Sequence, residues 1–406
     1  MTRHPHLPLG LGSSRRVTRD AWRNSLEGNV RSLANWKSGL GVGSSRNHTW
    51  TRRLWIALSV AAVILSSCGL TGIGSRLVWI EQHPKSRPSG LVGAPMAYDS
   101  ATRVVVLLGA PPPPGPLYDP TSTWKLTWTW NGTDWTEQHP ANSPPPPLVR
   151  PVMAYDGATQ TVVLFYGGGV LLKSPHWRVL PETWSWNGTT WAEQHPAQSP
   201  PPRRSASMAY DAATHQIVLF GGVDLCEVHQ RRGCGASHPS TWTWNGETWT
   251  KQHPTQNPPS RILAQMAYDA ATHQVVLFGG FRAGGSVGEL DDTWTWDGTN
   301  WTEQHPAQSP PPLAGASMAY DAAMHQVVLF GGGPSGPFRN LDDTWTWDGT
   351  TWTEQHPAQS PPGTQLASMA YDAATHSILL FGGLGKSSSE TWTLRLNEAL
   401  KGAARS

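Results

Sequence analysis

Two cysteines and two histidines lie close together in one segment of this 406-residue chain, at Cys226, His229, Cys234 and His238. Two thiolates and two imidazoles are enough ligands for a tetrahedral zinc ion. Cys226 and Cys234 can instead form a local disulfide in an oxidising compartment, which would stabilise the fold by about 2–3 kcal/mol. We predict the disulfide, with no bound metal and no other cofactor; a zinc site and free thiols are the alternatives.

Charged side chains gather in the same segment and in three others. Arginines can hold a carboxylate or sulfate through paired, charge-assisted hydrogen bonds, and histidines and acids can add polar contacts. The alternative is that these groups are solvated loop charges. The candidate ligand-binding residues are His176, Arg178, Asp224, His229, Arg232, Arg282 and Arg339.

Two further patterns resemble chemistry but recur with a fixed period. The acidic pairs Asp291-Asp292 and Asp342-Asp343 could suggest acid–base catalysis, and a His-Pro pair recurs along the chain. Residues repeated once per structural unit lie one unit apart in space, so they do not meet in one site. No catalytic triad order, phosphate-binding loop or metalloprotease motif is present in the sequence. We therefore predict no catalytic residue and favour a non-enzymatic protein, while leaving enzymatic activity open.

These residues are carried by a repeat whose Met-Ala-Tyr-Asp element occurs six times, 51 to 58 residues apart. Each copy holds four strand-like segments, a pattern typical of a β-propeller in which each copy forms one blade. The sequence therefore predicts an all-β, six-bladed propeller. The element begins at Met96, Met153, Met208, Met266, Met318 and Met369.

The fourth copy illustrates the expected blade. We predict strands at Gln265–Tyr268, Gln274–Phe278, Thr293–Trp296 and Asn300–Gln304. The second is continuously apolar, as expected for a strand covered on both faces. Asp297-Gly298 predicts a two-residue type I′ turn between the last two strands, because both turn positions then take positive φ.

The first and last copies are incomplete in complementary ways. The last copy ends after a third strand at Thr391–Leu394, whereas Leu77–Gln82 reads as a fourth strand ahead of the first copy. We predict that this N-terminal strand joins the C-terminal blade and closes the ring, which would leave no unpaired edge there.

Most of the tryptophans belong to the repeat. Of the 23 in the chain, 17 recur at equivalent positions, many in a Thr-Trp-Thr-Trp third strand. Residues two apart share one face of a strand, so each blade has an aromatic face and a threonine face. We interpret these tryptophans as packing between blades; a sugar-stacking platform is the alternative.

The glycine pair after an apolar strand, the acidic-aromatic third strand and the seven-residue step from Trp294 to Trp301 resemble the kelch repeat. The resemblance extends from Leu77 to about Leu396 and implies a galactose-oxidase-central-domain-like propeller. Kelch proteins include galactose-oxidase-like enzymes, a sialic acid epimerase and many binding proteins, so the resemblance implies a fold more than a function. We expect a binding or interaction module; a carbohydrate-active enzyme of the sialic acid epimerase-like kind is the alternative.

Only the loops between second and third strands vary from copy to copy. Variable loops on a rigid scaffold are the usual place for recognition, and all the candidate ligand-binding residues lie in them. We expect a protein or glycan ligand at this face, with the alternative enzyme using the same mouth. The loops are 109–123, 167–182, 222–240, 280–291, 332–342 and 383–390.

The N-terminal region is strongly basic. Residues 1–53 carry nine Arg and one Lys against Asp20 and Glu27, a net charge of +8, and read as a disordered leader. Residues 54–74 then provide a short apolar run followed by Cys68, which resembles an export signal with a lipobox. An uncleaved signal anchor is the alternative, because the run is almost long enough to span a bilayer.

Both interpretations place residues 75–396, the propeller, on the extracytoplasmic face of the cell membrane, followed by a tail at 397–406. In the first, Cys68 carries the lipid of a bacterial lipoprotein. The full chain has a net charge of +2, so the part after the leader is acidic overall. This distribution disfavours a nucleic-acid partner.

Overall fold

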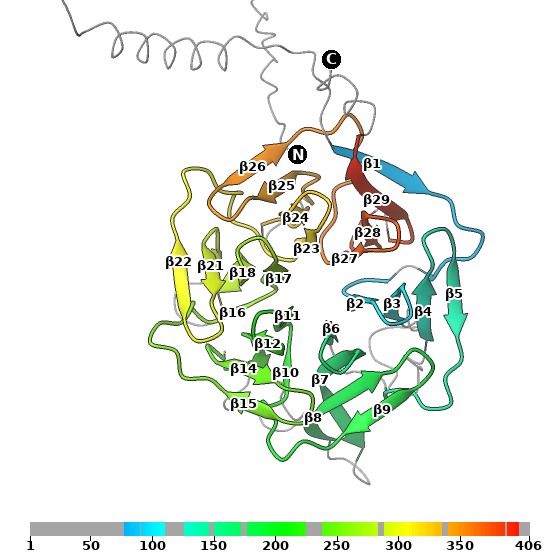
Figure 1. The fold of residues 1–406 in the computed structure, drawn as a ribbon, viewed down its shortest axis with the longest axis vertical. Helices are drawn as coiled ribbons and strands as arrows, with labels where there is room; N and C mark the ends of the chain where they lie inside the picture. Colours follow the sequence, from blue (N-terminus) through cyan, green and yellow to red (C-terminus); the bar gives the residue numbers. More distant parts are fainter. Residues whose placement is uncertain are drawn as a thin grey trace, which may run out of the picture. The chain divides into compact units, whose positions relative to one another are not determined.

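A computed structural model describes residues 77–89, 91–109, 126–145, 150–171, 177–224, 238–282, 288–334, 340–385 and 388–397. All the described residues belong to one compact unit within Ile73–Ser406. Within them the regular structure is entirely β, in antiparallel sheets (Figure 1).

The described strands form six four-stranded sheets, and each follows one copy of the repeat. The inner strands β2, β6, β11, β17, β23 and β27 each contact the next, and β27 also contacts β2. In chain order the sheets are β2 (Met96–Asp99), β3 (Val104–Gly109), β4 (Leu126–Trp130) and β5 (Trp135–Gln138); β6 (Val152–Asp156), β7 (Thr161–Leu171), β8 (Trp177–Trp186) and β9 (Trp191–Gln194); β11 (Ser207–Asp211), β12 (Gln216–Phe220), β14 (Thr241–Trp244) and β15 (Trp249–Lys251); β17 (Gln265–Asp269), β18 (Gln274–Phe278), β21 (Thr293–Trp296) and β22 (Trp301–Gln304); β23 (Ser317–Asp321), β24 (Gln326–Phe330), β25 (Thr344–Trp347) and β26 (Trp352–Gln355); β27 (Ser368–Asp372), β28 (Ser377–Phe381), β29 (Thr391–Leu396) and β1 (Leu77–Gln82).

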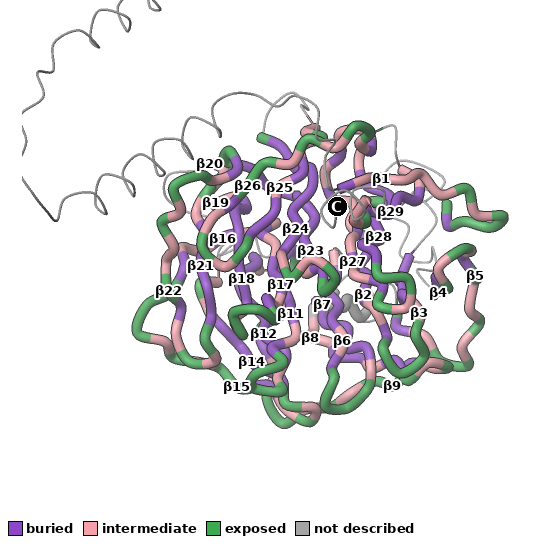
Figure 2. Tube along the Cα trace, turned by 45° about the horizontal axis from the view of Figure 1, so that its top comes forward, coloured by how far each residue is buried: buried purple, intermediate pink, exposed green. Residues whose placement is uncertain are grey.

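The second strand of each sheet supplies most of the core. In β18 the four residues after Gln274 are all buried, because neighbouring sheets cover both of its faces. Figure 2 shows the same burial along the inner strands, with exposure concentrated in the turns. The continuous apolar pattern that predicted this strand is confirmed.

The tryptophans pack between the sheets, as interpreted from the sequence. The fourth-strand tryptophan of every sheet donates its indole N–H to a threonine hydroxyl on the third strand of the preceding sheet, at 2.8–3.0 Å. A buried indole N–H needs such an acceptor. The donor–acceptor pairs are Trp79–Thr344, Trp135–Thr391, Trp191–Thr127, Trp249–Thr183, Trp301–Thr241 and Trp352–Thr293.

The N-terminal strand belongs to the C-terminal sheet. β1 pairs antiparallel with β29, in a register from Leu77 opposite Leu396 to Gln82 opposite Thr391. The strand expected at Thr391–Leu394 is therefore two residues longer, because β1 pairs with it along its whole length.

The predicted type I′ turn is wrong. Trp296 pairs with Trp301, so four residues form the loop, and of these only Gly298 has a positive φ, of +96°. The Asp297 carboxylate accepts hydrogen bonds from the backbone N–H groups of Thr299 and Asn300. This local side-chain bonding organises a wider turn than the dipeptide alone indicates.

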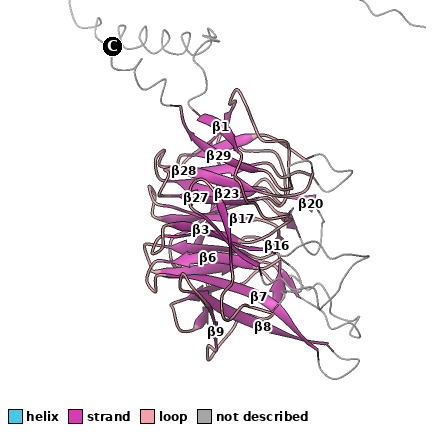
Figure 3. Cartoon of the chain, turned by 90° about the vertical axis from the view of Figure 1, so that its right-hand side faces the viewer, coloured by secondary structure: helices cyan, strands magenta, loops and turns pink. Residues whose placement is uncertain are grey.

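Short strands add a rim to two of the sheets. Next to the third sheet along the chain, β10 (Arg203–Arg204) pairs with β13 (Val223–Asp224) in a separate two-stranded sheet. Next to the fourth, β16 (Arg261–Ile262) pairs with β19 (Phe281–Arg282), which pairs with β20 (Gly288–Glu289), in a separate three-stranded sheet. Each rim joins the connector that enters a sheet to the loop after its second strand. Figure 3 shows β16 and β20 on one side of the molecule, which we call the variable-loop face.

Candidate ligand-binding site

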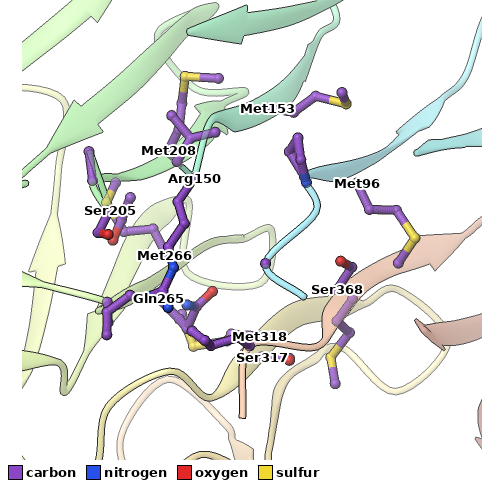
Figure 4. Close-up of a pocket in the computed structure, with 18 of the residues that line it drawn as sticks. Met96, Arg150, Met153, Ser205, Met208, Gln265, Met266, Ser317, Met318 and Ser368 are labelled. Atoms are coloured by element: carbon purple, nitrogen blue, oxygen red, sulfur yellow. The ribbon is translucent and has the colours of Figure 1, made fainter. Parts of the chain in front are cut away.

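A cavity of about 190 Å³ lies where the six inner strands begin. Each sheet contributes the first residues of its inner strand and the residues just before them (Figure 4). Because the inner strands start at the variable-loop face, the cavity lies toward the side on which recognition was expected. Six short segments, one from each copy of the repeat, thus form the wall of one central cavity.

The residue three positions before each repeat methionine has a left-handed backbone. These residues are Gly93, Arg150, Ser205, Leu263, Gly315 and Leu366, with φ between 41° and 68°. Four backbone hydrogen bonds of 2.7–3.1 Å link them across neighbouring sheets, with N–H donors and C=O acceptors running from Leu263 to Ser205, Gly315 to Leu263, Leu366 to Gly315 and Gly93 to Leu366.

Arg150 interrupts this chain of bonds. The bonds that would join it to Gly93 and to Ser205 are not formed among the described residues. Its side chain lines the cavity, and its stem lies beside Gly93, whose Cβ, if present, would be 3.6 Å from the Arg150 Cγ. Figure 4 shows the side chain extending into the ring of lining residues, toward the part where Gln265 lies.

The cavity is electrostatically positive. Arg150 is the one ionisable side chain among the described residues that line it. Burial, and secondarily the nearby Arg204 guanidinium, lowers the pKa of Arg150, yet an arginine remains protonated at neutral pH. No carboxylate in the described lining compensates this charge, so the cavity favours an anion.

Three of the four serines in the described lining already donate hydrogen bonds. Ser207 Oγ donates to the Ala264 carbonyl at 2.6 Å, and Ser317 Oγ donates to the Ala367 carbonyl at 2.8 Å. Ser368 Oγ likewise donates to the Ala94 carbonyl. These bonds hold neighbouring sheets together, and the Arg150 guanidinium is the one charged group in the described lining that can bind a ligand, with Ser205 and Gln265 as neutral polar neighbours.

Two of the seven candidate ligand-binding residues have described side chains. Asp224 on β13 is hydrogen-bonded to His238, and Arg282 on β19 occupies the equivalent position of the next sheet. No described contact joins Asp224 to Arg282. Arg178 lies on β8 with no description of its side chain, and the candidates outside the described residues are His176, His229, Arg232 and Arg339.

The cysteines and the N-terminal segments also lie outside the described residues. This applies to Cys226, Cys234 and Cys68, so the disulfide and the lipid attachment stay predictions. Among the residues that are described, no cluster of potential metal ligands is found. The same residues contain no helix long and apolar enough to cross a bilayer.

The acidic pairs and recurring histidines have structural positions. Asp292 forms a bidentate ion pair with Arg261, with oxygen–nitrogen distances of 2.6 and 2.7 Å. His273 has φ of +57° in the turn before β18, and its Nδ1 lies 3.3 Å from the Tyr268 hydroxyl. The equivalent His215 has the same arrangement with Tyr210 in the third sheet. Asp292 is thus held in a structural ion pair, and His215 and His273, which form a second recurring set beside the His-Pro pairs, occupy equivalent turn positions in their sheets. The histidines of the His-Pro pairs are exposed, as at His83 and His139.

Arg150 was missed by the sequence interpretation, which looked for ligand-binding residues only in the variable loops. The signal was present in the alignment of the copies. At this position the other copies have Gly, Ser or Leu, and only the second has a charged residue.

Comparison with known proteins supports the fold. The chain matches no family model and no curated protein sequence. It resembles the solved structure described as "Structure of YjhT", with a TM-score of 0.54 and 12% sequence identity over 76% of this chain and 95% of that one. The chain therefore has a propeller-like fold, and at this identity the likeness extends to the fold alone.

Proposed function

We propose that this chain is an exported, membrane-tethered kelch-type propeller that binds a small anionic ligand in its central cavity, from the variable-loop face. The observation that carries this proposal is the uncompensated Arg150 guanidinium in the cavity wall. A carboxylate or sulfate would provide the acceptors that this side chain lacks. The proposal treats the protein as a binding module.

Six blades in a closed ring are part of the proposal. Its support is the cycle of tryptophan–threonine hydrogen bonds, which connects each of the six described sheets to its predecessor, and the pairing of β1 with β29. A closed ring would fix the six cavity segments relative to one another. A rigid wall lowers the entropic cost of ordering a site around a ligand.

Two observations favour a small anion over the other ligand classes. The described lining contains no acid or base other than Arg150, so it lacks the paired groups that acid–base catalysis on a carbohydrate would use. Among the described residues, Val92 is the one large apolar side chain that is exposed, at 39%. A protein-docking patch would need a much larger apolar surface.

A titration of the full chain in detergent tests the binding site. Glucuronate, an anionic sugar, should bind, and neutral glucose should not. Arg150→Ser should weaken glucuronate binding by about 10- to 100-fold, because a hydrogen bond to a charged group contributes about 1.5–3 kcal/mol. Serine is already accommodated at the equivalent Ser205, so the variant should fold.

Arg87→Gln is the matched control, because Arg87 is exposed and does not line the cavity. It should bind glucuronate as the unmodified protein does. Equal affinity of Arg150→Ser and the unmodified protein, measured by isothermal titration calorimetry, would exclude Arg150 as the anion-binding group.

The membrane tether is tested separately. Cells expressing the full chain should incorporate a labelled fatty acid into it, and Cys68→Ser should abolish the label, because the lipid-bearing thiol is then absent. Protease added to cells with a permeabilised outer envelope should cleave the propeller. Retained label in Cys68→Ser would exclude the lipid attachment, and protection from protease would exclude export.

A further inference from the structure

The third and fourth sheets each carry an arginine on the connector that enters the sheet, Arg203 and Arg261, with exposures of 1% and 0%. The corresponding position has Leu91 in the first sheet, Leu313 in the fifth and Thr364 in the sixth. A fully buried guanidinium is destabilising unless its donors are paired. The two arginines meet this requirement differently.

Arg261 is fully paired. Its Nε donates to the Pro259 carbonyl at 2.9 Å, and its Nη1 donates to the Gly279 carbonyl at 3.0 Å. Its Nη1 and Nη2 also donate to the two oxygens of Asp292. Oδ2 of the same carboxylate accepts the indole N–H of Trp294 at 2.7 Å. One carboxylate thus satisfies three donor N–H groups.

Arg203 makes the same two hydrogen bonds to backbone carbonyls as Arg261 does, but it has no carboxylate partner of the Asp292 kind. Its Nε donates to the Pro201 carbonyl at 3.1 Å, and its Nη1 donates to the Gly221 carbonyl at 3.0 Å. Its remaining contact is a long one, 3.4 Å from Nη1 to the Ser240 Oγ. The Arg203 Nη2 and the Trp242 Nε1 are buried and have no hydrogen-bond partner among the described residues.

The cause of this difference is a single residue. Ser240 stands where the fourth sheet has Asp292, and a short neutral hydroxyl cannot reach both donors. Among the described carboxylates, Asp224 interacts electrostatically with Arg203, but it is hydrogen-bonded to His238. Burial lowers the pKa of Arg203 to about 10, so the guanidinium is still charged at neutral pH.

Among the described residues, a buried arginine beside an unpartnered indole N–H occurs in the third sheet alone. Trp345 in the fifth sheet also has an unpartnered indole N–H, but Leu313 fills the arginine position there. In the third sheet, a pocket of about 400 Å³ is lined by Pro201, Ser240 and Trp242, and Arg203 lies behind this lining, with its Nη1 3.4 Å from the Ser240 Oγ. Lys251 lines the pocket and contributes a positive charge to it.

We propose that this pocket binds the carboxylate group of a small organic acid. A movement of the Ser240 side chain would open the buried Arg203 Nη2 and Trp242 Nε1 to the pocket, and the carboxylate would then be held between them as Asp292 is held in the neighbouring sheet. The ligand supplies the two acceptor oxygens that Ser240 cannot. Its remaining atoms extend into the pocket beside Lys251. This site is separate from the central cavity, because it shares no lining residue with it.

Thermal unfolding of the full chain in detergent tests the site, with sodium acetate as the probe and sodium chloride at equal ionic strength as the reference. Acetate should raise the Tm of the unmodified protein in a saturable way, and chloride should not. Ser240→Asp should raise the Tm by a few degrees without ligand and lose the acetate response, since it restores the arrangement of the fourth sheet.

Two further variants keep the test decisive if Ser240→Asp folds poorly. Arg203→Leu should lose the acetate response, and its fold is compatible with leucine at the equivalent Leu91 and Leu313. Asp292→Ser reproduces the third-sheet arrangement in the fourth sheet, so its Tm should fall and acetate should partly restore it. Because acetate could also bind Arg150 in the central cavity, all these measurements are made in an Arg150→Ser background, which should keep the acetate response of the third-sheet pocket.

The proposal is overturned if acetate and chloride act equally on the unmodified protein. It is also overturned if Arg203→Leu retains the acetate response, or if acetate fails to restore Asp292→Ser. An acetate response retained by a folded Ser240→Asp variant would also overturn the proposal.

Discussion

Asp292 shows how one side chain joins several elements of a sheet. Burial alone would raise the pKa of this carboxyl, but the hydrogen bonds and charge of Arg261, with the Trp294 indole, outweigh burial and leave the pKa below its usual value. A carboxylate held in this way stabilises the folded state only while it is ionised. Arg261 is fully buried and Asp292 largely so, and removing the carboxylate therefore leaves the buried arginine charge uncompensated.

Asp292→Asn should therefore destabilise the protein by about 3–5 kcal/mol at neutral pH, as measured by urea denaturation. Because the folded pKa lies below the unfolded value of about 3.9, the contribution of Asp292 is complete above that pH and is lost as the pH falls through the folded pKa. The difference between Asp292→Asn and the unmodified protein should thus shrink below about pH 4.

Asp291→Asn provides the control, because Asp291 is exposed one residue away. It should change the stability by less than about 0.5 kcal/mol. A loss in Asp292→Asn that is equally small, or that does not vary with pH, would contradict the role of the ion pair.

At the residue scale, the sequence revealed the framework more readily than the two arginine sites. Arg150 and Ser240 differ from the residues at equivalent positions of other copies, but the exposure and partners of Arg150 and Arg203 depend on how the segments meet in space. No local pattern indicates that Arg150 faces a cavity or that Ser240 leaves two donors without an acceptor. Comparing the copies position by position would have identified both residues as exceptions.

At the element scale, alternating or continuous apolar residues in the sequence predict the strands, whereas hydrogen bonds from side chains determine the shape of the turns. β18 was predicted with its observed bounds because QVVLF can be buried on both faces. The turn after β21 was not, because the Asp297 carboxylate bonds the following N–H groups and widens the loop. The rim strands β10 and β16 were also missed, since two residues carry too little pattern to identify a strand.

The strand β1 offers an element-scale test. Trp79 is fully buried, and its indole contacts Phe330 at 5.0 Å between ring centroids as well as bonding Thr344. Trp79→Ala should therefore destabilise the protein by about 3–5 kcal/mol in urea denaturation, as expected for removal of a buried tryptophan. Trp301→Ala, the equivalent change inside the chain, should cost a similar amount.

The comparison between the two variants tests the position of β1 directly. If the N-terminal strand were detached, Trp79 would be solvated and its replacement would change the stability by less than about 0.5 kcal/mol. Such a result beside a large effect of Trp301→Ala would contradict the pairing of β1 with β29.

At the scale of the whole molecule, the fold follows from repetition and the sites follow from departures from it. Each interface between sheets has the same apolar cluster and the same tryptophan–threonine bond, so the repeat alone predicts the arrangement. The central cavity is a product of all six copies together. Its charge comes from one copy, which is why the propeller-like fold was predictable and the position of the anion site was not.

The pairing of β1 with β29 also affects how the protein is made. β1 is synthesised first and its partner last, with about 300 residues between Gln82 and Thr391. At roughly 5–20 residues per second, β1 waits tens of seconds for its partner. In a chain that stops before Thr391, β1 lacks the strand with which it pairs. Trp79 and the rest of β1 therefore stay accessible to chaperones and proteases until β29 has been synthesised.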